Sequence, residues 1–203
     1  GGLRGGGAYC GRMRERDAGR LHVIAGPMFA GKTEELLRRV HRAQLAGLDV
    51  QVFGHRLDTR GGAERLSTHA GRSAPARLVE QAAQLRAAIG ATRPDLVAID
   101  EAQFFGPPIV PVIEELLAAG IQVEVAGLCV TYEGGPFAPI PHLMAVAEEV
   151  VKLTAVCTVC GADAAFHVRL VADGADALQP TAAQVGGAES YQARCRRHRR
   201  EQV

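Results

Sequence analysis

The 203-residue sequence lacks several features that would place it in common functional classes. It has no apolar run near the roughly 18 residues that a transmembrane helix needs, which excludes a membrane span. Its formal net charge is only +1, so there is no general reason to expect nucleic acid as a partner. Apolar residues make up 47% of the chain and charged residues 22%, which is typical of a folded domain. The length suits one full-sized domain with a small addition.

Cysteine is scarce and odd in number, which argues against a disulfide framework. The five cysteines are Cys10, Cys129, Cys157, Cys160 and Cys195. The first 20 residues are rich in glycine and arginine and lack the apolar core of a signal peptide. We therefore expect residues 1–19 to be a disordered extension and the protein to be cytoplasmic. In a reducing compartment the CxxC pair at 157–160 is more typical of a metal or redox motif than of a disulfide.

From residue 21 onward, short apolar runs alternate with segments of helical periodicity. Strands are expected at 21–25, 50–53, 96–99, 121–126 and 151–156. Helices are expected at 33–45, 77–89, 109–119 and 143–150. This alternation predicts right-handed crossovers and an α/β fold whose parallel sheet is covered by helices on both faces. Residues 54–75 show no clear period, and we expect a long, functional loop there.

The segment after the first expected strand fits the pattern GxxxxGK[ST]. It consists of Gly26, Pro27, Met28, Phe29, Ala30, Gly31, Lys32 and Thr33. In this motif backbone amides surround the phosphates of a nucleoside triphosphate, the lysine neutralises the β- and γ-phosphates, and the hydroxyl holds Mg²⁺. A chance glycine-rich turn is the alternative. However, this segment joins a strand to a helix and uses Lys32, one of only two lysines against 21 arginines. The pattern favours a P-loop NTPase-like domain.

Two acidic residues follow the buried strand at 96–99. Asp100 can hold Mg²⁺ through water, together with Thr33. Glu101 comes next, where an ATPase would use a carboxylate to orient water and a kinase could use it to accept a proton from a substrate hydroxyl. A solvated acidic turn is the alternative, and the neighbouring phosphate loop makes it the weaker one.

The C-terminal part carries a second cysteine motif. Cys157 and Cys160 form CxxC, and Cys195 and His198 form CxxH after 34 intervening residues. Three thiolates and one imidazole are a typical ligand set for tetrahedral Zn²⁺. A lone CxxC could be a redox pair or two buried thiols, but the second pair favours structural zinc. We therefore predict a nucleotide-binding domain over 20–155 and a small zinc-binding domain over 156–203.

A run of arginines lies near the C-terminus. It comprises Arg194, Arg196, Arg197, Arg199 and Arg200. Because the total charge is nearly neutral and a charge run is usually a solvated face, we interpret it as exposed surface and expect no nucleic-acid contact.

Together these motifs resemble the thymidine kinase family whose members carry a zinc-bound lasso domain. The similar segments are GPMFAGKT (26–33), LDTR (57–60), STHAG (67–71), AIDEAQFF (98–105), the PF of GGPFAPI (134–140), KLTAVCTVCG (152–161) and VGGAESYQARCRRH (185–198). The resemblance implies transfer of the ATP γ-phosphoryl group to the 5′-hydroxyl of thymidine or deoxyuridine, in pyrimidine deoxynucleotide salvage. It also implies a homotetramer and dTTP as a feedback inhibitor.

The resemblance also implies roles for particular residues. Glu101 matches the catalytic base. The residues that match the ATP and phosphate region, beyond the phosphate loop, are Asp58, Arg60, Asp100 and Gln103. Those that match the thymidine pocket are Met28, Leu128, Tyr132 (where the family usually has phenylalanine), Ala182, Ala183, Gln184, Val185, Gly186 and Tyr191.

The sequence departs from the family pattern at Cys129, Gly61 and Ala70, which bears on loop packing and substrate range but removes no phosphate, magnesium or zinc ligand. Two other functions remain open. One is an ATPase or GTPase switch whose zinc ribbon binds nucleic acid or protein, although no NKxD-type segment for guanine is present. The other is a non-catalytic module that retains nucleotide binding. The presence of both Lys32 and Glu101 opposes this last function.

Overall fold

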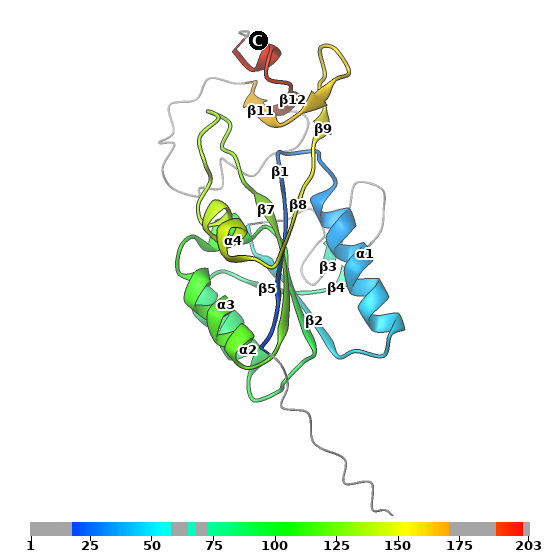
Figure 1. Ribbon diagram of the computed structural model, residues 1–203, viewed down its shortest axis with the longest axis vertical. Helices are drawn as coiled ribbons and strands as arrows, with labels where there is room; N and C mark the ends of the chain where they lie inside the picture. Colours follow the sequence, from blue (N-terminus) through cyan, green and yellow to red (C-terminus); the bar gives the residue numbers. More distant parts are fainter. Residues whose placement is uncertain (1–17, 58–64, 68–72, 171–189, 201–203) are drawn as a thin grey trace, which may run out of the picture.

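A six-stranded parallel sheet forms the centre of the computed structural model, which describes residues 18–57, 65–67, 73–170 and 190–200 (Figure 1). The strand order is β5-β2-β6-β7-β1-β8. The strands are β1 (Leu21–Gly26), β2 (Val50–His55), β5 (Arg77–Val79), β6 (Leu96–Ile99), β7 (Gln122–Leu128) and β8 (Glu149–Lys152). Each neighbouring pair is parallel, which confirms the predicted α/β fold.

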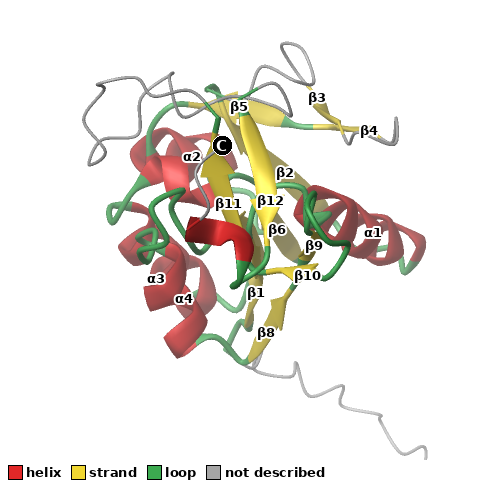
Figure 2. Cartoon of the chain, turned by 90° about the horizontal axis from the view of Figure 1, so that it is seen from above, coloured by secondary structure: helices red, strands yellow, loops and turns green. Residues whose placement is uncertain are grey.

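Helices cover both faces of this sheet. Helix α1 (Lys32–Leu45) lies on one face, and α2 (Ala82–Ile89), α3 (Ile109–Ala118) and α4 (Ile140–Val146) lie on the other (Figures 1 and 2). Side chains of β1 alternate between the two layers. Val23 packs into the cluster beneath α2, α3 and α4, whereas Ile24 packs with Leu36 and Val40 of α1. Because both faces are buried, the strands read as continuous apolar runs rather than as an alternation.

The helix predicted over 77–89 is too long at its start. Residues Arg77–Val79 form β5 instead, which pairs with Phe53–His55 of β2 at the edge of the sheet. Helix α2 begins only at Ala82, where Gln81 and Gln84 form a reciprocal capping box. The pairing with β2 is non-local, so it overrides a helical periodicity that the local sequence continues to show.

Two other predicted boundaries shift for the same reason. The helix predicted over 143–150 is α4, which ends at Val146, and Glu149–Lys152 forms β8 beside His22–Ala25 of β1. The strand predicted over 151–156 is therefore divided between β8 and β9 (Ala155–Val156). Within the region predicted as a loop, β3 (Arg65–Ser67) and β4 (Ser73–Pro75) pair as antiparallel strands.

A small C-terminal unit lies above the carboxyl ends of β1 and β7 (Figure 1). It contains two antiparallel pairs, β9 with β10 (Asp163–Ala164) and β11 (Phe166–Arg169) with β12 (Tyr191–Arg194), followed by the short helix η3 (His198–Arg200). Its apolar centre packs against Ala30 of the phosphate loop. The domain division near residue 155 stays a prediction. At the N-terminal boundary, Gly19, the last residue of the predicted extension, donates its N–H to the carbonyl of Leu117 at 2.8 Å and so packs with the domain.

None of the helices that the structure describes is long and apolar enough to cross a membrane.

Candidate active site

The predicted phosphate loop connects the end of β1 to the start of α1. Phe29 and Gly31 both have positive φ angles, of 66° and 79°. Glycine adopts this conformation without steric cost, whereas at Phe29 it is strained, as is frequent at binding sites. The buried Lys32 side chain donates from Nζ to the carbonyl of Pro27 at 2.8 Å. This hydrogen bond links the end of the loop to its beginning. Helix α1 starts at this point, and its N-terminus favours an anion.

The loop is joined to the acidic end of β6. The Thr33 hydroxyl donates to Asp100 Oδ2 at 2.8 Å, and Asp100 is only 1% exposed. The structure therefore brings together the two side chains that the sequence predicts as magnesium ligands. A hydroxyl and a carboxylate are hard oxygen donors, as Mg²⁺ prefers, so this pair fits the ion.

Glu101 follows in a strained conformation and is held by a neighbouring amide. Its φ of 51° and ψ of 40° are left-handed, which is uncommon for a residue other than glycine. Gln103, in the 3₁₀ helix η1 (Ala102–Phe105), donates from Nε2 to Glu101 Oε2 at 2.6 Å. Its Oε1 accepts the N–H of Leu128 at 2.9 Å. These contacts indicate that Gln103 orients Glu101, and its predicted contact with phosphate stays a prediction.

A close packing contact supports this arrangement from β7. A Cβ atom on Gly127 would lie 2.6 Å from Cδ1 of Ile140 and 2.9 Å from Oε1 of Gln103. Any larger residue at position 127 would therefore have to displace the Ile140 and Gln103 side chains, the second of which holds Glu101. The sequence did not indicate this role for Gly127.

Two tyrosines from distant parts of the chain meet beside the phosphate loop. The rings of Tyr132 and Tyr191 have centroids 6.5 Å apart, and Tyr191 is 2% exposed. Leu128, at the end of β7, is also buried. The described part of the predicted thymidine pocket thus comes from the phosphate loop, the end of β7, the turn after it and β12.

His167 is a buried residue of this region that the sequence did not single out. It lies on β11 opposite Ala193, and its Nδ1 accepts the N–H of Met28 in a long contact of 3.5 Å. Its ring also meets Tyr191 edge to face at 5.8 Å. Burial, and then the charge of Lys32, lowers the pKa of His167 to about 3, so the ring is neutral and its nitrogen is free to accept. The pairing of β11 with β12 places His167 beside the phosphate loop, and no local sequence pattern indicates that pairing.

The four predicted zinc ligands form one cluster. The ligand atoms of Cys157, Cys160, Cys195 and His198 all lie within 4.8 Å of one another. Sγ of Cys160 is 3.8 Å from Sγ of Cys195, and Nδ1 of His198 is 3.3 Å and 3.7 Å from the sulfur atoms of Cys195 and Cys157. A tetrahedral ion with zinc–sulfur bonds of about 2.3 Å would set these separations at roughly 3.8 Å between sulfurs and roughly 3.6 Å between sulfur and nitrogen. The cluster fits Zn²⁺.

The charge state of one ligand, Cys157, also suits a metal. Burial opposes ionisation of the Cys157 thiol, but nearby backbone N–H groups, that of Cys195 foremost, and the His198 ring outweigh it and lower its pKa to about 5. A thiolate rather than a thiol is the form that ligates metal.

Comparison with known proteins decides the family. A family model described as thymidine kinase matches residues 19–199. The chain belongs to the thymidine kinase family. The thymidine kinase of Deinococcus deserti is 45% identical over 189 residues, covering 89% of this chain and 94% of that protein. That of Deinococcus radiodurans is 43% identical over 184 residues, covering 86% and 87%. That of Halobacterium salinarum strain R1 is 44% identical over 182 residues, covering 89% and 93%.

Some residues implied by the resemblance to thymidine kinases lie outside the described part of the chain. They are Asp58, Arg60, Ala182, Ala183, Gln184, Val185 and Gly186, together with the departures Gly61 and Ala70. The third departure, Cys129, is described, and it is partly buried against the core beneath α2, α3 and α4.

The arginine run is only partly the solvated surface that the sequence predicted. Arg194 is 6% exposed, on β12, and donates to Gln192 at 2.8 Å. Arg199 stacks over the Phe166 ring, 4.2 Å from its centroid, and a Cβ atom on Gly134 would lie 2.5 Å from Nη2 of Arg199. Arg199 therefore packs the small C-terminal unit against the turn that carries Tyr132, whereas Arg194 is buried within β12.

Replacing Cys157 by serine is expected to abolish stoichiometric metal binding, because serine supplies no thiolate for the fourth ligand position. Purified wild-type protein should contain about one zinc per chain, and Cys157→Ser well under half of that, as measured by atomic emission.

We also expect removal of the metal to raise the KM for thymidine, since the cluster holds the unit that carries Tyr191.

The matched control is Cys129→Ser, which changes a partly buried thiol outside the cluster. It should retain the metal. A Cys157→Ser protein with full zinc content, or a metal-free preparation with unchanged thymidine kinetics, would contradict the assignment.

Proposed function

We propose that this chain transfers the γ-phosphoryl group of ATP to the 5′-hydroxyl of thymidine. Membership of the thymidine kinase family supports the reaction, and one observation in the structure supports its location. The phosphate loop and the Asp100–Glu101 pair are joined by the bond between Thr33 and Asp100. A phosphate-binding loop and a candidate base thus share one edge of the sheet.

The triphosphate would bind at the start of α1. Loop amides and the helix N-terminus face the phosphates, and Lys32 adds a positive charge beside them. Thr33 and Asp100 would hold Mg²⁺, which when bound neutralises charge on the phosphate oxygens. In this arrangement the protein contributes mainly positioning and electrostatic stabilisation, as phosphoryl transfer requires.

Glu101 would act as the general base. As the thymidine 5′-oxygen forms a bond to the γ-phosphorus, the bond from that phosphorus to the β,γ-bridging oxygen breaks and ADP leaves with the electron pair. The proton of the 5′-hydroxyl passes to the Glu101 carboxylate. The hydrogen bond from Gln103 fixes the direction of that carboxylate before the substrate arrives.

The nucleoside base would lie between the phosphate loop and the small C-terminal unit. Tyr132 provides a flat face for stacking, and Met28, Leu128 and Tyr191 surround it. We propose that the main chain of residues 182–186 hydrogen-bonds N3–H and O4 of thymine. Cytosine would then leave buried donors and acceptors unpaired and be rejected. Deoxyuridine has the same hydrogen-bonding edge and should also be accepted.

Several further properties follow from the family resemblance alone, and we propose them on that ground. The Cys/His cluster would hold a structural zinc ion. The protein would form a homotetramer in the cytoplasm, and dTTP would inhibit it by filling the same cleft as the substrates.

An assay of the four common deoxynucleosides with ATP and Mg²⁺ tests the function directly. Thymidine should release ADP at a rate far above the background without nucleoside, and deoxycytidine and the purine nucleosides should not. Release of ADP that RNA or DNA stimulates and no nucleoside does would identify an ATPase instead, and would refute the kinase proposal.

Replacing Glu101 by glutamine is expected to lower kcat by at least about 10²-fold, the usual effect of losing a general base. The amide keeps the size and one hydrogen-bond acceptor of the side chain but cannot take a proton. Steady-state kinetics with saturating thymidine and ATP measure the change. Glu133→Gln, an exposed acid next to Tyr132, is the matched control and should leave kcat near the wild-type value. Near-normal turnover in Glu101→Gln would show that this carboxylate is not the base.

A further inference from the structure

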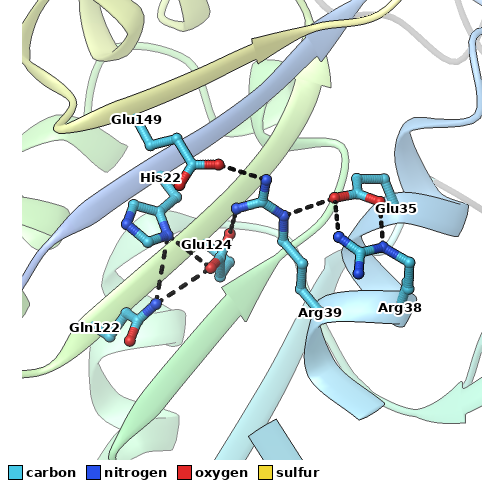
Figure 3. Close-up of polar contacts among 7 residues, drawn as sticks. All are labelled: His22, Glu35, Arg38, Arg39, Gln122, Glu124 and Glu149. Carbon is cyan, nitrogen blue, oxygen red and sulfur yellow. Dashed lines mark hydrogen bonds and ion pairs between the residues drawn. The ribbon is translucent and has the colours of Figure 1, made fainter. Parts of the chain in front are cut away.

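An ionic cluster with a buried centre lies beneath α1 and contributes no group to the site described above (Figure 3). At its centre is Glu124 of β7, which is 3% exposed. One carboxylate oxygen, Oε1, lies 2.9 Å from Nδ1 of His22, and the other, Oε2, accepts from Nη1 of Arg39 at 3.3 Å. Gln122 also donates to Oε1 at 3.3 Å. Both oxygens of a single buried carboxylate are therefore engaged.

The two main partners of this carboxylate stand on the two elements that hold the phosphate loop. His22 is on β1, four residues before the loop begins at Gly26, and Arg39 is on α1, six residues after Thr33. We propose that Glu124 is a positioning residue for ATP, because its carboxylate fixes β1 and α1 relative to each other and so sets the shape of the loop between them.

Arg39 connects α1 to two strands of the sheet and also bonds to a carboxylate of its own helix. It donates to Glu149 of β8 at 2.7 Å and to Glu35 of its own helix at 2.8 Å, in addition to Glu124 of β7. Strands β7 and β8 flank β1 on its two sides, with Glu124 and Glu149 both beside His22 in the register. The guanidinium therefore holds α1 directly over the strand that leads into the phosphate loop.

Glu35, within the same helix, adds a third carboxylate beside Arg39. The guanidinium of Arg38, followed by that of Arg39, lowers the pKa of Glu35 to about 2, so this carboxylate is ionised at any working pH. Among the residues drawn in Figure 3, Arg38 hydrogen-bonds to Glu35 of its own helix, through Nε at 2.6 Å and Nη2 at 2.7 Å.

Apolar packing alone is a weak constraint on the rotation and the axial position of α1 on the sheet. Beyond the ion pairs, α1 meets the sheet through the hydrogen bond from Thr33 to Asp100 in its first turn and through apolar side chains further along. These are Leu36, Leu37, Val40 and Ala43, and dispersion contacts of this kind have little directionality. Charge-assisted hydrogen bonds are directional, so the contacts of Arg39 with Glu149 at 2.7 Å and with Glu124 at 3.3 Å together help to define the rotation and the axial position of the helix. Conversely, buried ion pairs are often no more stabilising than apolar residues of the same size. Fixing geometry is therefore a better explanation of the cluster than adding stability.

The experiment replaces Glu124 by methionine, which keeps the volume, and by glutamine, which keeps an acceptor for Arg39. In Glu124→Met the KM for ATP should rise about tenfold, the size of one lost charge-assisted hydrogen bond, with little change in the KM for thymidine. Glu124→Gln should recover part of the loss. Arg86→Met is the matched control: it breaks the exposed pair between Arg86 of α2 and Glu115 of α3, away from the loop, and should leave both KM values unchanged.

Two further measurements separate positioning from stability. In the double variant Glu124→Met/Arg39→Met the ATP KM should rise by less than the product of the two single rises, because both changes break the contact between Arg39 and Glu124. The melting temperature is recorded for every variant. If Glu124→Met does not fold, Glu124→Gln is tested alone, with an expected rise of at least about threefold.

An unchanged ATP KM in a folded Glu124 variant would overturn the inference. So would equal rises in the KM values for ATP and thymidine that follow the loss of melting temperature, because that pattern reports general destabilisation. The inference depends on the proposed binding of ATP by the phosphate loop. Calorimetric ATP binding to the same variants tests it even if wild-type protein fails to phosphorylate thymidine, so the two failures are distinguishable.

Discussion

The hydrogen bond between the Thr33 hydroxyl and Asp100 joins the two halves of the nucleotide site. Thr33 belongs to the first turn of α1 and Asp100 to the end of β6, with β7 lying between β6 and β1 in the sheet. Because the strands are parallel, their carboxyl ends meet at one edge, and the phosphate loop, Asp100 and Leu128 all lie there. Gln103 then connects Leu128 to Glu101, so the position of the proposed base depends on the same edge.

A second constraint comes from the small C-terminal unit, which lies directly on the phosphate loop. Ala30 packs against its apolar centre, and the backbone of Met28 contacts His167 of β11. The Cys/His cluster ties β9, the turn after it and β12 into one piece, and β12 carries Tyr191 toward Tyr132. The unit that carries the candidate metal site and the phosphate loop thus share a boundary, so a metal bound in the cluster would affect binding of the nucleoside from a distance.

Features encoded by contiguous residues were predictable from the sequence, and features created by pairing across the chain were not. The phosphate loop, Asp100 and the two metal-ligand pairs each have a local pattern, and the structure brings their members together as expected. The strand at Arg77–Val79 exists because β2 offers it an edge, so the local helical periodicity was misleading. His167 and Arg199 likewise acquire their contacts only from strand register and tertiary packing. The contact of Glu124 with His22 depends on the register of β7 with β1, and its contact with Arg39 depends on the packing of α1 over these strands.

The proposed binding of Mg²⁺ by Thr33 and Asp100 is tested most directly by measuring the Kd for ATP across a Mg²⁺ titration, by calorimetry, in wild-type protein and in Asp100→Asn. Wild-type affinity should rise with Mg²⁺. The variant should lose most of that rise, while its affinity without Mg²⁺ stays equal or improves because one negative charge near the phosphates is gone. A folded Asp100→Asn protein with the wild-type dependence on Mg²⁺ would contradict the account.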